Sequence, residues 1–339
     1  MRTPLYATLL AVAAVATVAG CGDTTPAYGD PNSIVAAMSP AIWDKVSKDV
    51  YAALEPTIRT VRNEKTFTVT YQDPGQRDWG NLRRFRQMLL VGTGTEPWMQ
   101  DAVDKLKTPL NGPGLYTAYD VWAKGQQVTV VILSNPDSLS ELRQYLPTIN
   151  KTLDDQYRQW ARNRMYMSGM DTALVDTLMA SARFSLLVPK VYKHSDLDSV
   201  TDSVYIFRND NPDPSELIRE IAVTWRSPIP LNYQPEDILD WRAQLVTHYH
   251  DAQVVDTTQM SGGPFKYQGH SAYEIQAIWQ NAPDLDWPAA GPFITRAIVC
   301  PAQNRMYLVD GWLYAPGRDK YEYMIQLQTI LDSFRCGAS

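Results

Sequence analysis

Hydrophobic residues in the first half of the chain change repeatedly between the period of a strand and the period of a helix. Alternation or a short unbroken apolar run predicts a strand, and repeats at three and four residues predict a helix. We therefore predict strands at residues 33–38, 66–72, 86–93, 116–123 and 127–134. Helices are predicted at 40–54, 98–107 and 138–182, the last one interrupted near Ser168-Gly169. The run VTVVIL at 128–133 is apolar throughout, which places this strand inside a sheet.

Short polar motifs mark the starts of several predicted helices. Ser39-Pro40 supplies an N-cap followed by proline at the first helical position, and Asp171 restarts the interrupted helix. Ser138 and Glu141 have the spacing of a capping box, in which each side chain bonds a backbone amide of the other end of the turn. Asp319 and Glu322 repeat this spacing in charged form.

The second half of the chain continues the mixture of strands and helices. Strands are predicted at residues 184–189, 204–209, 220–227, 270–280, 293–301 and 305–315, and helices at 235–249 and 319–335. Residues 121–153 and 299–335 each combine two strands, a proline and a helix, which an internal duplication and a common α+β pattern explain equally well. We expect an α+β fold with mixed or antiparallel sheets, helices packed on one side, and two halves, 32–183 and 184–339, around one extended core.

Residues 1–20 have the pattern of a secretory signal peptide, with Arg2 before an apolar segment that ends in small residues. Val18-Ala19-Gly20-Cys21 resembles the bacterial lipobox, which implies cleavage before Cys21, a diacylglycerol on its sulfur and acylation of the new amine. Ordinary cleavage that leaves a free cysteine is the alternative. Two or more acyl chains anchor a protein stably. We therefore expect a bacterial envelope protein held to a membrane by lipid on Cys21, on the periplasmic or outer side, with residues 21–31 as a flexible tether.

Composition excludes some classes of partner. The formal net charge of −6 argues against a nucleic-acid partner, whose phosphates require an excess of lysine and arginine. The chain has ten tryptophans and nineteen tyrosines, which predict either a sugar-stacking surface or aromatic core packing. Paired carboxylates such as Asp154-Asp155 and Asp284 with Asp286 have no spacing that requires a function.

Several motifs of the second half carry a family resemblance. They are Ile278-Trp279, Gly291-Pro292-Phe293, and Asp310-Gly311-Trp312-Leu313-Tyr314-Ala315-Pro316 with Lys320 and a closing amphipathic helix. Together with Arg62-Asn63 and Val188-Pro189-Lys190-Val191-Tyr192, this pattern resembles domain-of-unknown-function family 4837. The resemblance covers most of the mature chain and implies an exported bacterial lipoprotein without an established activity. Ala289-Ala290 and Tyr321 depart from the family's pattern, which has Met-Gly and Arg there.

His248-Tyr249-His250-Asp251 is the densest set of metal-ligating residues, and zinc is the metal that such a set would bind. On the predicted helix, however, residues two apart are separated by about 200°, which points the two imidazoles away from each other. Asn209-Asp210-Asn211-Pro212-Asp213 has the oxygen-rich composition of a calcium loop but lacks the glycine and glutamate of an EF-hand frame. Turn formation explains the second motif, so we assign no metal.

Two further motifs hint at catalysis or phosphate binding. Gly92-Thr93-Gly94 follows an apolar strand but lacks the other residues of a dinucleotide site or a P-loop. Met260-Ser261-Gly262-Gly263-Pro264 offers Ser261 as a nucleophile with His270 nearby in sequence, although Gly-Gly-Pro also predicts a plain turn. We assign neither a catalytic residue nor a cofactor.

The chain path predicts a disulfide between Cys300 and Cys336. With Cys21 lipidated, two thiols remain, and an exported protein folds under oxidising conditions. Strand 293–301 runs one way, strand 305–315 returns, and helix 319–335 reverses again, which brings residue 336 back toward residue 300. Two separately buried free cysteines are the alternative.

The sequence favours a non-enzymatic envelope protein that binds a ligand or an envelope protein partner, or that supports a complex. An envelope hydrolase acting on glycan or peptide is the alternative, and a carbohydrate-binding module is a third hypothesis. A concave site with clustered His, Asp, Ser and Trp would favour the enzyme. An exposed aromatic patch without titratable groups would favour a binding protein.

Overall fold

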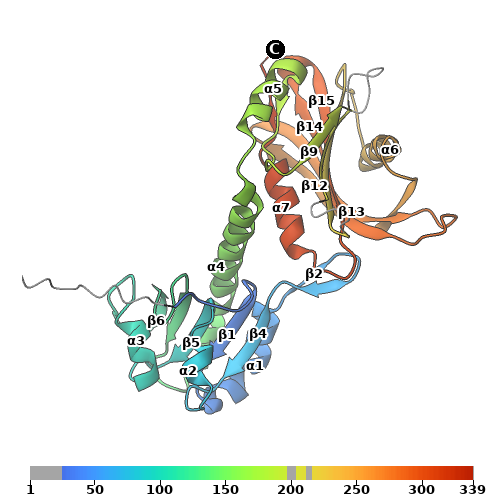
Figure 1. Ribbon diagram of the computed structural model, residues 1–339. Helices are drawn as coiled ribbons and strands as arrows, with labels where there is room; N and C mark the ends of the chain where they lie inside the picture. Colours follow the sequence, from blue (N-terminus) through green and yellow to red (C-terminus); the bar gives the residue numbers. More distant parts are fainter. Residues whose placement is uncertain (1–24, 197–203, 211–215, 339) are drawn as a thin grey trace, which may run out of the picture.

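The computed structural model describes residues 25–196, 204–210 and 216–338. Each half of the chain forms its own sheet, and the long helix α4 (Leu139–Met165) runs from the first toward the second (Figure 1). We call residues 25–165 the N-terminal unit and residues 166–338 the C-terminal unit. The predicted signal peptide and Cys21 lie outside the described residues. Among the helices that the structure describes, none is both long and apolar enough to cross a membrane.

The N-terminal sheet has five strands in the order β4-β1-β5-β7-β6. Its strands are β1 (Ser33–Ala37), β4 (Thr68–Gln72), β5 (Gln87–Gly92), β6 (Gly114–Tyr119) and β7 (Gln127–Ile132). β1 pairs in parallel with β4 and β5, β5 pairs in parallel with β7, and the edge strand β6 runs antiparallel to β7. The mixed sheet therefore has a parallel centre, whose strands are connected through helices.

Helices cover both faces of this sheet, whereas we expected them on one side. α1 (Pro40–Leu54) and α4 pack on one face. α2 (Trp79–Leu82), the 3-10 helix η1 (Pro97–Met99) and α3 (Gln100–Val103) lie on the other. β5 and β7 are buried along their whole length, so successive side chains point into two different cores. This two-sided burial explains why the run at 128–133 is apolar without a break.

The C-terminal sheet has seven antiparallel strands in the order β12-β13-β14-β15-β11-β10-β9. They are β9 (Lys193–Asp196), β10 (Tyr205–Asn209), β11 (Ile218–Arg226), β12 (Gln253–Tyr267), β13 (His270–Asn281), β14 (Ala290–Cys300) and β15 (Arg305–Tyr314). α5 (Thr172–Ala182) and α7 (Tyr321–Leu331) pack on one face, and α6 (Pro235–Val246) packs on the other. The fold is α+β, as predicted, again with helices on both sides of the sheet.

The unpredicted strands of the C-terminal sheet are β9 and β12. β12 contains Met260–Pro264, where we expected a turn, because its ladder with β13 shifts register between Asp256 and Ser261. Such a bulge keeps a glycine-rich segment inside a strand. The predicted strand 184–189 is reduced to β8 (Phe184–Ser185), which pairs with β16 (Arg335–Cys336), and the predicted helix 98–107 is shortened to η1 and α3.

The two sheets differ in strand order and in strand direction. β7, which precedes α4, sits beside a parallel neighbour, whereas β15, which precedes α7, has antiparallel neighbours on both sides. The two strand–strand–helix units thus share a local pattern within different topologies. Of the two explanations that the sequence left open, the topology favours the common α+β pattern over duplication.

Helix starts follow the sequence in part. Asp171 caps α5, because its side chain accepts a hydrogen bond from the backbone N of Leu174 at 3.0 Å. The two predicted capping boxes do not form. Glu141 accepts from the backbone N and the hydroxyl of Ser134 instead, and Asp319 pairs with Arg62 at 3.2 Å. In both cases a residue outside the helix binds a carboxylate of the predicted capping box, so this carboxylate does not bond the backbone of the first helical turn.

Several contacts join the units, among them a ring stack and a buried ion pair. Tyr157 of α4 stacks on Tyr321 of α7, with ring centroids 5.6 Å apart. The hairpin of β2 (Thr57–Arg59) and β3 (Asn63–Lys65) contributes Glu64, which is buried and lies 3.0 Å from the Nζ of the equally buried Lys320. α5 packs in the core of the C-terminal unit. The junction therefore lies near residues 166–171, upstream of the boundary at 183 and 184 that we expected.

The first described residues are not a free tether. The backbone N of Ala27 donates to the carbonyl of Lys124 at 2.8 Å, and the N of Lys124 donates to the carbonyl of Thr25 at 3.0 Å. The ring of Tyr28 packs on Phe85 with centroids 4.8 Å apart. The expected tether over 21–31 is wrong from residue 25 onward, because these residues add to the edge of the N-terminal unit.

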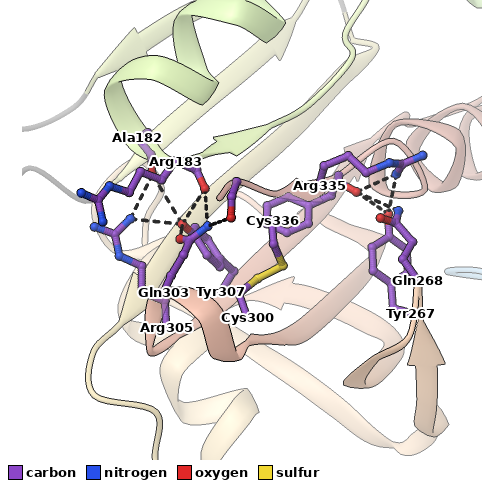
Figure 2. The surroundings of a disulfide bond; sticks show 12 residues. Ala182, Arg183, Tyr267, Gln268, Cys300, Gln303, Arg305, Tyr307, Arg335 and Cys336 are labelled. Carbon is purple, nitrogen blue, oxygen red and sulfur yellow. Dashed lines mark hydrogen bonds between the residues drawn. A yellow bond between two sulfur atoms is a disulfide. The ribbon is translucent and has the colours of Figure 1, made fainter. Parts of the chain in front are cut away.

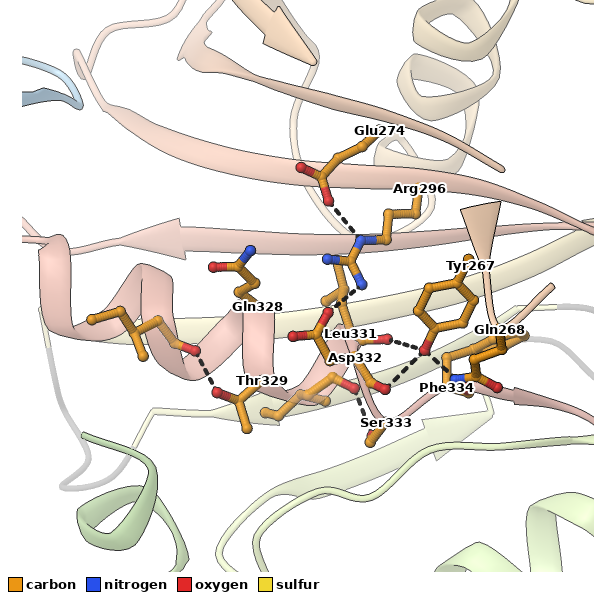
Figure 3. Close-up of polar contacts among 12 residues, drawn as sticks. Tyr267, Gln268, Glu274, Arg296, Gln328, Thr329, Leu331, Asp332, Ser333 and Phe334 are labelled. Carbon is orange, nitrogen blue, oxygen red and sulfur yellow. Dashed lines mark hydrogen bonds and ion pairs between the residues drawn. The ribbon is translucent and has the colours of Figure 1, made fainter. Parts of the chain in front are cut away.

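The predicted chain path brings Cys300 and Cys336 to disulfide distance, with their Cα atoms 5.9 Å apart (Figure 2). Next to them, Tyr267 at the end of β12 closes the end of α7. Its hydroxyl lies 3.0 Å from the carbonyl oxygen of Leu331 and 2.9 Å from those of Asp332 and Phe334 (Figure 3). The last carbonyls of a helix have no partner inside it, so this hydroxyl satisfies part of that need.

Candidate functional site

A cavity of about 580 Å³ opens at the end of the C-terminal sheet where β13 and β15 finish and residues 247–251 follow α6. We call it the aromatic pocket. Five of the residues that line it have aromatic rings: Tyr249, Trp279, Trp287, Trp312 and Tyr314. Its volume lies in the range of about 300–1,000 Å³ that is typical of small-molecule sites.

Gly291 allows the tryptophans of two non-adjacent strands to meet. Trp279 of β13 lies opposite Gly291 of β14 and reaches across it, so that its Nε1 donates to the carbonyl of Leu313 on β15 at 3.1 Å. A Cβ at residue 291 would lie 1.9 Å from that carbonyl oxygen and 2.8 Å from the indole nitrogen. The ring of Trp279 consequently stacks on that of Trp312, with centroids 4.6 Å apart.

His250 completes a stack of three rings. Its imidazole lies on Trp312 with centroids 4.3 Å apart, and its Nε2 is 2.6 Å from the Oε2 of Glu220. Glu220 is buried and also accepts from the Nη1 of Arg208 at 2.7 Å. Because an ionised carboxylate only accepts hydrogen bonds, Nε2 of His250 is the donor. The stack therefore has its orientation set by one buried carboxylate.

A buried ion pair lies behind this wall. The Nε of Arg242 is 2.8 Å from the Oδ1 of Asp310, and both side chains have at most 1% exposure. Thr295 donates to the same carboxylate oxygen, and the guanidinium of Arg242 lies 3.6 Å from the ring centroid of Phe293. A buried pair of this kind fixes the arrangement of its neighbours, because neither charge tolerates the loss of its partner.

Three polar atoms of the pocket lining are buried without a hydrogen-bond partner among the described residues: Tyr249 Oη, Gln253 Oε1 and Trp312 Nε1. Burial, and next the nearby Asp310 carboxylate, raise the pKa of Tyr249 well above its usual value. Its hydroxyl is thus neutral at physiological pH. The wall therefore has both donor and acceptor capacity that the protein leaves unused.

The comparisons with known proteins divide the chain at the same place as the structure. Residues 172–333 match the family described as domain of unknown function DUF4837. The C-terminal unit is therefore similar to the DUF4837 family over most of its length. The match confirms the family resemblance, although Arg62-Asn63 lies outside it. Residues 27–166 match a second family, described as domain of unknown function DUF8532.

No curated protein sequence matches the chain significantly. Solved structures similar to it include the solution structure of cyanobacterial PsbP (CyanoP) from Synechocystis sp. PCC 6803, at 12% identity and a TM-score of 0.31, covering 45% of this chain and 86% of that one. Another is the Saccharomyces cerevisiae Ran-binding protein Mog1p, at 13% identity and a TM-score of 0.33, covering 45% of this chain and 90% of that one.

Three of the five motifs that carry the DUF4837 resemblance meet at the aromatic pocket. Trp279 and Trp312 form its stacked wall, Gly291 permits their contact, and Asp310 holds the ion pair behind them. Sequence reasoning did not find this site, because its residues come from several strands, the stretch after α6 and the loop that follows β13. One feature of the sequence could have indicated the site: three motifs that are far apart in the chain and contain aromatic residues or glycine all belong to the same family pattern.

The cluster His248-Tyr249-His250-Asp251 lines this pocket, and its side chains are not arranged around a common metal position. α6 ends at Val246, three residues earlier than predicted. His248 is exposed, and His250 contacts Glu220. Within the described part of the chain, no three His, Cys, Asp or Glu side chains are grouped so that they could hold a metal ion.

The other sequence candidates remain apart. Ser261 lies opposite Gln276 in the β12–β13 ladder, six positions from the Tyr267–His270 pair and so about 20 Å along the strand. The loop of Gly92-Thr93-Gly94 is closed by Glu96, which accepts from the backbone N of Thr93 at 3.1 Å. A carboxylate in this position repels phosphate. Of the oxygen-rich loop, residues 211–213 lie outside the described residues, and Asp210 pairs with Arg208 at 3.2 Å.

Two other cavities have similar volumes. One of about 490 Å³ lies between the units and is lined by Arg158, Ser261 and Tyr321 among others. One of about 540 Å³ is lined by Arg164, Arg219 and Arg318. The aromatic pocket has the most aromatic rings of the three, and its lining residues carry three unpartnered buried polar atoms, against one for each of the other two cavities. We therefore take it as the candidate ligand site.

Proposed function

We propose that the protein is a lipid-anchored envelope protein that binds a small ligand in the aromatic pocket and carries out no chemistry on it. The observation that supports this function best is the combination of clustered rings with unpartnered donors and acceptors in one cavity. A few polar groups in a mostly apolar cavity are the usual composition of a ligand site.

The polar groups of the pocket favour binding over hydrolysis. His250 and Arg208 both donate to Glu220, so this carboxylate is fully engaged in holding the wall. The one Ser or Thr hydroxyl among the residues that line the cavity, on Thr247, donates to the carbonyl of Gln244 at 2.8 Å. A nucleophile needs a base within reach, and this hydroxyl is bonded elsewhere.

Ligand capture tests the binding function. The purified full-length protein is incubated with a small-molecule extract of the bacterial envelope, and the retained compounds are identified by mass spectrometry. We expect wild type to retain a compound that Trp287→Ala loses and that Tyr119→Ala, an exposed aromatic of the N-terminal unit, retains. Retention of no compound by wild type, or release of a chemically altered product, contradicts the proposal.

A further inference from the structure

Trp287 is the accessible ring of the aromatic pocket. Its side chain is 51% exposed, and no other tryptophan among the described residues is exposed to this degree. The loop that carries it is tied to the end of β13, because Asn281 Nδ2 donates to the carbonyl of Trp287 at 3.1 Å. An exposed indole at a cavity, on a loop whose backbone is tied to the sheet, is a surface that a ligand can bury.

The opposite wall leaves no gap for a flat aromatic ligand. Trp312 has His250 on one face and Trp279 on the other, at 4.3 and 4.6 Å between centroids. A planar ligand cannot insert between rings that are already in contact. A ligand in this pocket therefore stacks with one face, on Trp287, and meets polar groups around its edge.

The charges at the pocket favour a neutral ligand. Arg208 and Asp251 are the one basic and the one acidic residue of the lining besides the histidines, so these two formal charges cancel. Gln253 and Asn281 add neutral amides to the lining, beside the hydroxyls of Tyr249 and Tyr314, and Gln253 Oε1 has no partner among the described residues. Rotation of this flexible side chain brings its buried oxygen to a ligand.

On the basis of the proposed function, we propose that the ligand is a neutral saccharide. A pyranose ring has C–H groups on its faces and hydroxyls around its edge, which fits one exposed indole with amides beside it. A hydroxyl both donates and accepts, so it serves the carbonyl and the NH₂ of an amide equally. The ring packs on Trp287, and its hydroxyls bond Gln253 and Asn281.

A glycan array tests the ligand class, followed by titration calorimetry with the best oligosaccharide, with choline chloride and with adenosine as probes of other chemistry. We expect the detergent-purified full-length protein to bind a saccharide and neither of the other probes. Trp287→Ala should bind it about tenfold more weakly, Trp287→Phe should bind it better than the alanine variant, and Tyr119→Ala should match wild type.

The outcomes separate the two proposals. Binding of choline or adenosine that depends on Trp287, without saccharide binding, overturns the saccharide class but leaves the ligand-binding function standing. Saccharide binding that Trp287→Ala retains in full overturns the stacking arrangement. If the array shows no binding and envelope extract yields no retained compound, both proposals fail. Thermal denaturation of each variant shows whether it is folded, and Trp287 is exposed, so its replacement leaves the core intact.

Discussion

At the scale of single residues, the pocket depends on one position without a side chain. Gly291 has no Cβ, and Trp279 occupies the space above it to reach the carbonyl of Leu313. The contact between β13 and β15 is thus made over the strand between them. This is an arrangement in which a small change at one residue displaces a whole ring.

Gly291→Ala should therefore destabilise the protein and disturb the pocket together. The new Cβ would lie 1.9 Å from the carbonyl oxygen of Leu313, a backbone atom that cannot move without shifting β15. We expect a loss of about 3 kcal/mol in the free energy of unfolding in urea and altered tryptophan fluorescence. The control is Gly80→Ala, where no heavy atom lies within 4 Å of the added carbon. Equal stabilities of the two variants would contradict this account.

Tyr192 links single-residue burial to the effect of pH. Its side chain is buried, its hydroxyl has no hydrogen-bond partner among the described residues, and burial raises the pKa of Tyr192 to about 12. Above a pH of about 10, the unfolded chain releases the phenol proton while the folded protein keeps it. The contribution of the neutral Tyr192 phenol to the free energy of unfolding is thus complete below that pH, and it is lost as the pH rises through about 12.

Tyr192→Phe should remove this loss. At pH 7 we expect an unchanged stability or a gain of about 1 kcal/mol, because a desolvated hydroxyl without a partner disappears. Between about pH 10 and 12 the difference in favour of the variant should grow by up to about 1.4 kcal/mol per pH unit. Urea unfolding at several pH values measures both quantities. Parallel curves for wild type and variant would show that the phenol ionises equally in both states.

At the scale of elements, the sequence predicts strands and helices whose burial pattern is regular and fails where register or pairing decides. β1, α1 and β15 have strong periodicity or caps, and they lie where we predicted them. β12 was missed because its Gly262-Gly263-Pro264 segment predicts a turn locally, whereas the partner strand β13 holds it in the ladder. The pocket was missed for the same reason: its residues become neighbours only when the strands pair, and the sequence of one strand does not show which residues lie opposite it.

The disulfide is an element-scale prediction, because it ties the end of β14 to β16 after α7. Cys300 and Cys336 are 36 residues apart, and closing a loop of that length contributes about 4 kcal/mol in the chain-entropy model. When protein purified from the envelope is denatured without reductant and alkylated, both cysteines should stay unmodified, because their sulfur atoms are joined to each other. Cys300→Ser with Cys336→Ser should unfold at lower urea concentration. Full alkylation of both residues before reduction would mean that the bond is absent in the cell.

At the scale of the whole molecule, the two units are held together by both buried and exposed contacts. Glu64 and Lys320 form an ion pair that excludes water, and Arg164 pairs with Glu322 at 2.9 Å across the same joint. The aromatic pocket lies in the C-terminal unit, while the described chain begins on the N-terminal unit. The pocket and the start of the described chain therefore lie on different units.

This geometry sets the orientation that a lipid on Cys21 would impose. Thr25 is already bonded to Lys124, so four residue steps link it to Cys21 and span at most about 14 Å. The edge of the N-terminal unit that holds Thr25 and Lys124 would then lie close to the membrane. A fluorophore at Lys124→Cys should be quenched by spin-labelled lipid, and one at the fully exposed Leu231→Cys should not. Cys21→Ser should abolish the quenching and release the protein from membranes. Equal quenching at both positions would show that the C-terminal unit also approaches the bilayer.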